Sequence, residues 1–102
     1  DGVDVVVTHA PPVGCKCAAD SNGRDHGDPE LWDVLRDAPP RLVLAGHIHR
    51  APVRWARWSQ MDGSTLVLVP SNDEESDVPA HWVLDIDGKL AVHSDGTQVE
   101  WP

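Results

Sequence analysis

The chain has 102 residues, which is enough for one domain and too few for a multidomain protein. It carries 8 Lys and Arg against 17 Asp and Glu, a formal net charge of -9. This balance disfavours a partner held through clustered phosphate contacts, so nucleic acid is expected at most as a substrate. Hydrophobic residues make up 40% and charged residues 25% of the chain, which is too apolar for a disordered tail.

No apolar stretch approaches the ~20 residues of a membrane-spanning helix, and no basic and apolar leader precedes a cleavage site. The two cysteines, Cys15 and Cys17, are too close together to build a disulfide framework. We therefore expect a cytoplasmic protein that does not contact a membrane. Because Asp1 is followed almost at once by an apolar run, we also expect this chain to be a piece of a longer protein.

The first expected element is a strand at Val3–Val7, a β-branched run. Pro11 and Pro12 cannot continue a β-ladder, so the strand should end near His9. A nearly unbroken apolar run is typical of a strand buried on both faces, with helices above and below the sheet. Residues 13–27 are mostly polar and predict a long loop, a kind of segment that is usually functional or mobile.

A helix is expected to begin at Asp28. This residue suits the N-cap, Pro29 suits the first helical position, and Glu30 places an acid in the first turn. The apolar residues that follow have the i, i+3, i+4, i+7 spacing of one buried stripe: Leu31, Val34, Leu35 and Ala38. Pro39 and Pro40 end the helix.

A second buried strand is expected at Arg41–Ala45, closed by the sequence Gly-His-Ile-His at 46–49. A strand, a helix and a strand in this order predict a βαβ unit with parallel strands. Parallel strands place their carboxyl ends at one edge of the sheet, where open α/β folds bind ligands. His9, His47 and His49 should therefore meet at that edge.

The second half predicts short strands without helical periodicity. Asp-Gly pairs at 62–63, 87–88 and 95–96 separate alternating apolar runs, a strong hairpin signal. We expect an α/β fold with a βαβ unit over residues 1–50 and an antiparallel meander over 51–102. Ile86 is expected to continue the alternation of Trp82 and Leu84, and Leu90 and Val92 follow in the next strand. His81 and His93 are expected to face solvent, and the acidic segment 72–77 to form a solvated turn.

The His-x-His pair at 47 and 49 is the first chemical signal. In an extended chain, residues i and i+2 point the same way with Cα atoms roughly 6.6 Å apart. Two such imidazoles can reach one metal ion, or two ions ~3.5–4 Å apart. Two surface histidines after a strand are the more frequent meaning of this pattern alone. His9 at the same edge shifts the balance towards a shared metal site.

A strand ending in Thr-His-x-Pro at 8–11, followed by a helix and a strand ending in Gly-His-x-His at 46–49, resembles the C-terminal half of the calcineurin-like metallophosphoesterases. The resemblance runs from about Val3 to Ile86. It implies part of an α/β sandwich with two divalent ions (Mn, Fe or Zn) that hydrolyses phosphomonoesters or phosphodiesters by metal-activated hydroxide. It also implies that His9 and His47 bind one ion, that His49 binds the other, and that His26 contacts the phosphoester substrate.

The motifs Asp-x-His, Gly-Asp-x-x-Asp and Gly-Asn-His-[Asp/Glu] of that family do not occur in the sequence. In the family these motifs supply the bridging carboxylate and most ligands of one ion. We therefore expect the N-terminal half of the domain to be a missing partner, encoded upstream of Asp1, and the chain alone to be inactive.

Two other functions stay open at this stage. The chain can be a non-catalytic binding module that keeps the shape without the ions. It can also be a small zinc-stabilised domain that uses Cys15, Cys17 and histidines, although Cys-x-Cys is not the usual spacing of a zinc knuckle.

Overall fold

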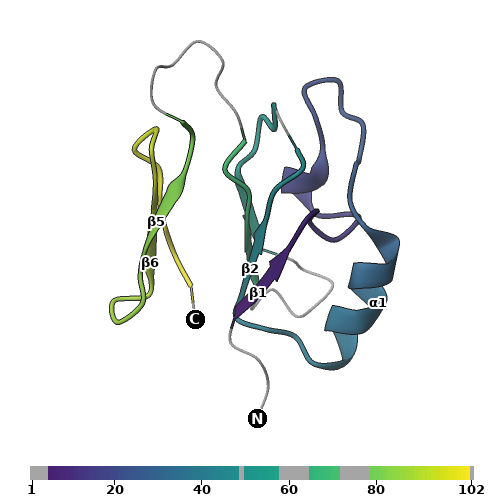
Figure 1. Ribbon diagram of the computed structural model, residues 1–102, viewed down its shortest axis with the longest axis horizontal. Coiled ribbons are helices and arrows are strands. Elements are labelled where there is room, and N and C mark those ends of the chain that lie inside the picture. Colours follow the sequence, from purple (N-terminus) through teal and green to yellow (C-terminus); the bar gives the residue numbers. More distant parts are fainter. Residues whose placement is uncertain (1–4, 49, 58–64, 72–78, 102) are drawn as a thin grey trace.

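The computed structural model describes residues 5–48, 50–57, 65–71 and 79–101, and Figure 1 shows the course of the chain. Over these residues the protein is mixed α/β, with one α-helix and strands in two sheets. In chain order the elements are β1 (Val5–Thr8), the 3-10 helix η1 (Lys16–Ala18), α1 (Pro29–Asp37), β2 (Leu42–Ala45), β3 (Trp55–Arg57), β4 (Leu66–Leu68), β5 (Trp82–Asp85), β6 (Leu90–His93) and β7 (Gln98–Glu100).

The four-stranded sheet contains the predicted βαβ unit. Its strand order is β1-β2-β4-β3, and β1 and β2 are parallel, with Val5 opposite Leu42 and Thr8 opposite Ala45. The carboxyl ends of these two strands therefore lie at one edge of the sheet, as the sequence predicts.

The prediction of a purely antiparallel second half is wrong for its first two strands. β3 and β4 do pair antiparallel with each other, with Ala56 opposite Val67, but β4 then pairs parallel with β2. All three residues of β4 are buried, so this strand fits only the interior of a sheet that is covered on both faces. The Asp62-Gly63 turn and the acidic segment 72–77 lie outside the described residues.

The last three strands form the predicted antiparallel meander, a separate sheet in the order β5-β6-β7. β5 ends at Asp85, and Ile86 lies exposed in the following turn instead of continuing the strand. In β6, the residues Ala91 and His93 are the buried ones, whereas Leu90 and Val92 are only half-buried. The expected alternation is thus shifted by one residue in this strand.

The elements stack as three layers, with the four-stranded sheet between α1 on one side and the three-stranded sheet on the other (Figure 1). Each face of the central sheet has its own buried cluster. The cluster on the helix side comprises Cys15, Cys17, Ala18, Leu35, Val43, Ala45, Ile48, Ala51, Ala56, Val67 and Val69. The cluster between the sheets comprises Leu42, Leu66, Leu68, Ala91, Val99 and Trp101.

Helix α1 begins as predicted. The Asp28 carboxylate accepts hydrogen bonds from the N–H groups of Glu30 (2.9 Å) and Leu31 (3.3 Å), and Pro29 occupies the first helical position. The predicted apolar stripe is only partly correct, because Val34 is 68% exposed. Leu31, Trp32 and Leu35 pack against the core instead, so the buried face is rotated relative to the predicted one.

β1 is not buried on both faces. Within the described part of the chain it pairs with β2 alone, and Val7 is 77% exposed. Val5 and Val7 share the exposed face, whereas Val6 packs against the helix-side cluster. Among the described residues no helix is long and apolar enough to cross a membrane.

Candidate metal centre

His9 and His47 lie side by side at the carboxyl edge of the central sheet. His9 directly follows β1, and His47 comes two residues after β2. The backbone N–H of Gly46 donates to the His9 carbonyl at 3.0 Å, which holds the two strand ends together. His9 Nε2 lies 3.1 Å from His47 Nδ1, and the ring centroids are 4.8 Å apart. Because both rings are exposed, solvent and ligands can reach them.

His47 has an unusual backbone. Its φ is 71°, a conformation that favours glycine, and the N–H of Ile48 donates to the Gly46 carbonyl at 2.9 Å. This hydrogen bond closes a three-residue γ-turn around His47, the rarer form with positive φ at its centre. Such strain costs on the order of 1–3 kcal/mol and concentrates at functional sites. The turn directs the His47 ring towards His9.

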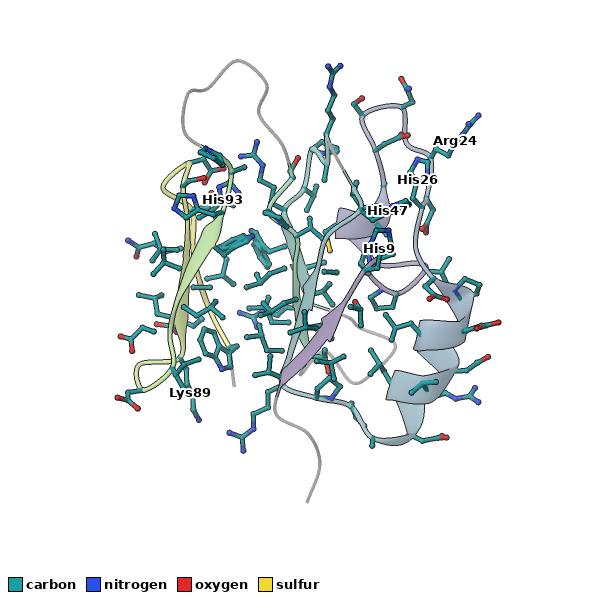
Figure 2. All side chains as sticks on the ribbon, in the orientation of Figure 1. His9, Arg24, His26, His47, Lys89 and His93 are labelled. Carbon is teal, nitrogen blue, oxygen red and sulfur yellow. The ribbon has the colours of Figure 1, made fainter. Side chains whose placement is uncertain are left out.

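The loop between β1 and α1 brings a third histidine to this edge. The His26 ring lies 6.1 Å from the His47 ring, nearly perpendicular to it, and its Nε2 lies 2.8 Å from Asp20 Oδ2. The His26 ring and the N–H groups of Arg24 and Asn22 hold the pKa of the Asp20 carboxyl below its usual range. Figure 2 shows His9, His26 and His47 gathered beyond the end of β1, with His93 apart on the three-stranded sheet.

This loop is fixed by its own hydrogen bonds. The N–H of Val13 donates to the carbonyl of Asp28 at 3.2 Å, and the N–H of Asp28 donates to the carbonyl of Pro11 at 2.8 Å, so both ends of the loop meet. Gly27 lies so close to this crossing that a Cβ there would stand 2.5 Å from Val13 Cα. Only glycine therefore fits at position 27, directly after His26.

A hollow of about 380 Å³ adjoins the histidines. Its lining residues are Asp20, Ser21, Asn22, His26, His47, Ile48 and Arg50. The side chains of His26, His47 and Arg50 can all present N–H groups to an anion, which is the chemistry that a phosphoryl group requires.

The His9 and His47 nitrogens have a separation that suits a shared metal ion. Two nitrogen ligands about 2.1 Å from one ion, with 90–110° between the bonds, stand ~3.0–3.4 Å apart. The observed separation of 3.1 Å falls in this range, and it equally fits a hydrogen bond from one ring to the other. Within the described ranges no group of three His, Cys, Asp or Glu side chains gathers to hold an ion, so the fit extends to two ligands.

The structure agrees with the predicted positions of some histidines and not of others. The structure brings His9 and His47 together and places His26 beside them, whereas His49 lies outside the described residues. His81 is exposed as expected, but the prediction for His93 is wrong, because this residue is only 3% exposed. Its ring packs edge-on against Trp82, with centroids 4.9 Å apart.

Sequence reasoning missed Asp20, the partner of His26. The signal was present in the turn sequence Asp-Ser-Asn-Gly at 20–23, where an aspartate commonly accepts hydrogen bonds from the backbone that follows. Here Asp20 Oδ1 accepts from the N–H groups of Asn22 and Arg24, which leaves Oδ2 free for His26.

Comparison of the chain with protein-family models, with curated proteins and with solved structures found no match.

Proposed function

We propose that this chain is the histidine-bearing C-terminal part of a calcineurin-like metallophosphoesterase, which hydrolyses phosphomonoesters or phosphodiesters at a dinuclear metal centre. The observation that supports this proposal is the convergence of His9 and His47, whose ring nitrogens lie 3.1 Å apart at the ends of neighbouring parallel strands.

The residues have separate roles in this proposal. His9 and His47 would hold one divalent ion (Mn, Fe or Zn), and His49 is assigned to the second ion by its position in the Gly-His-x-His motif. When bound, such ions supply hydroxide at neutral pH and neutralise charge on the phosphoryl oxygens. His26, whose Nε2 donates to Asp20 at 2.8 Å, would in its doubly protonated form donate from Nδ1 to a phosphoryl oxygen in the adjoining hollow.

The proposed site needs a partner. The carboxylate motifs that complete such a centre are not in the sequence, and two imidazoles alone bind a divalent ion weakly. The chain on its own is therefore expected to be inactive, and the remaining ligands would come from a segment that carries those motifs.

The histidine pair is tested with Zn²⁺ and nuclear magnetic resonance. Zn²⁺ titration of the ¹⁵N-labelled chain is expected to shift the side-chain nitrogen resonances of His9 and His47 and to leave those of His81 in place. Removing one of two ligands weakens an ion's binding by at least about tenfold, so His9→Ala and His47→Asn should each show that loss. Asn is chosen at 47 because it tolerates the positive φ of this position. His81→Ala, at an exposed site just before β5, is the matched control.

Equal Zn²⁺ affinity in the wild type and both variants would remove the metal site from the proposal. The enzymatic part has its own test, hydrolysis of p-nitrophenyl phosphate (a monoester) and bis(p-nitrophenyl) phosphate (a diester) with Mn²⁺. The chain alone should give no turnover. A chain extended by the coding sequence that precedes it should give turnover that His47→Asn abolishes. If the extended chain binds Zn²⁺ at His9 and His47 but hydrolyses neither phosphomonoesters nor phosphodiesters, the non-catalytic binding module is the correct alternative.

A further inference from the structure

Cys15 and Cys17 form a close pair of thiols away from the histidines. They flank Lys16 where the loop enters η1, and their Sγ atoms lie 3.2 Å apart. Both are free cysteines, and their separation fits a hydrogen bond from one thiol to the other. Neither residue has a role in the proposed hydrolysis.

The two thiols differ in their surroundings. Cys17 is fully buried and lies against the carbonyl of Val67 at 3.9 Å. The hydrogen bond from Cys17 holds the pKa of Cys15 below its ordinary value, whereas the same bond and burial raise the pKa of Cys17 far above it. Cys15 is therefore the better nucleophile of the two.

Cys15 also has a route to solvent. It is 5% exposed and lines a hollow of about 560 Å³ with Lys16, Trp55 and Arg57 among the other lining residues. The hollow is large enough for a small oxidant. A small oxidant would therefore reach Cys15 before it reaches Cys17.

We propose that Cys15 and Cys17 are a peroxide-reactive redox pair, in which Cys15 is oxidised first and Cys17 then closes an intrachain disulfide. The Cys15 thiolate attacks one oxygen of a hydroperoxide, the O–O bond breaks, and the leaving oxygen takes a proton to become water or an alcohol. The Cys17 thiol loses its proton and attacks the sulfur of the Cys15 sulfenic acid, and the displaced hydroxide leaves as water. Two thiols and one hydrogen peroxide thus give one disulfide and two waters.

The closure requires a small movement of the two sulfurs. Their separation would fall from 3.2 Å to the roughly 2.05 Å of a disulfide. The ring enclosed by residues 15–17 is small, so its disulfide should be strained and readily reduced. η1 also supports the histidine loop, because the Ala18 carbonyl accepts from the N–H of His26 at 2.9 Å.

The test uses the reduced full chain and one equivalent of hydrogen peroxide, with intact-mass measurement after alkylation of the remaining thiols in denaturant. The wild type is expected to lose about 2 Da, to take up no alkylating agent, and to recover both thiols with dithiothreitol. In Cys17→Ser, dimedone should trap a sulfenic acid on Cys15. This sulfenic acid should form as fast as the wild type loses its first thiol. Cys15→Ser should react at least about tenfold more slowly, because Cys17 is buried and protonated.

A second comparison needs no variant. The folded wild type should form the disulfide several-fold faster than the same chain in urea, because unfolding removes the hydrogen bond that favours the Cys15 thiolate. Equal rates in the two conditions would overturn the proposal. So would accumulation of Cys15 sulfenic acid in the wild type, disulfide-linked dimers, or equal reactivity of Cys15 and Cys17. None of these results bears on the metal site, which can stand or fail independently.

Discussion

His47 illustrates how a single residue can be predicted in place but not in conformation. Its neighbourhood with His9 follows from two strand ends in a parallel βαβ unit, which the sequence indicates clearly. Its γ-turn with φ 71° does not, because no turn signal in Gly-His-Ile-His specifies which residue takes the left-handed conformation. The γ-turn brings His47 Nδ1 to within 3.1 Å of His9 Nε2.

A second single residue, Asp95, should make the free energy of unfolding depend on pH. Its carboxylate accepts from the Thr97 N–H at 2.8 Å and from the Arg54 guanidinium, and these contacts hold its pKa well below the usual range. Because the pKa is lower in the folded than in the unfolded chain, Asp95 stabilises the fold above the unfolded pKa of about 3.9. This contribution disappears as the pH falls from there towards the folded pKa.

Asp95→Ala should therefore lower the free energy of unfolding at pH 7, and the gap from wild type should shrink steadily below about pH 4. Urea unfolding across this pH range measures it, with Asp87→Ala, in the exposed turn after β5, as the control. A gap of constant size down to pH 2 would show that Asp95 acts through packing and not through its charge.

At the scale of elements, the start of α1 can be read directly from the sequence. Asp28 caps the helix through bonds to the N–H groups of Glu30 and Leu31. Replacing such a cap with Ala costs about 1 kcal/mol, because the first-turn N–H groups lose their acceptor. Asp28→Ala should show this loss in urea unfolding and faster amide exchange in the first turn. Asp33→Ala, exposed in the middle of the same helix, should change stability by less than about 0.5 kcal/mol.

Some elements and contacts could be predicted from local sequence patterns, and others could not. Local chemistry located α1 and the Asp-Gly turns of the three-stranded sheet, and parallel-strand geometry placed His9 beside His47. The parallel pairing of β4 with β2 depends on contacts between residues 42–44 and 66–68, and no local pattern reports such a partner. The exposed Val34 and the half-buried Trp32 show the same limit, because the face of a helix that packs depends on the sheet beneath it.

At the scale of the whole molecule, the two sheets are joined by hydrogen bonds as well as by apolar packing. Beside the apolar cluster, two side chains of the three-stranded sheet donate to carbonyls just past β4. Trp82 Nε1 donates to Val69 at 2.8 Å, and His93 Nε2 donates to Pro70 at 2.8 Å. His93 Nδ1 accepts from the N–H of Asp95 at 3.0 Å, so both ring nitrogens have hydrogen-bond partners. This explains why a histidine expected at the surface is buried.

The His93 contact gives a prediction about the joint between the sheets. His93→Phe keeps an aromatic ring of similar size but leaves the Pro70 carbonyl without this donor. The Pro70 carbonyl is half-buried, so losing this hydrogen bond should cost about 0.5–1.5 kcal/mol, whereas His81→Ala, at an exposed site next to the same strand pair, should cost less than about 0.5 kcal/mol. Urea unfolding followed by tryptophan fluorescence and by circular dichroism measures both. If His93→Phe matches the wild type in stability, apolar packing alone joins the sheets. If the two probes separate only in His93→Phe, the hydrogen bond is what makes the two sheets unfold as one unit.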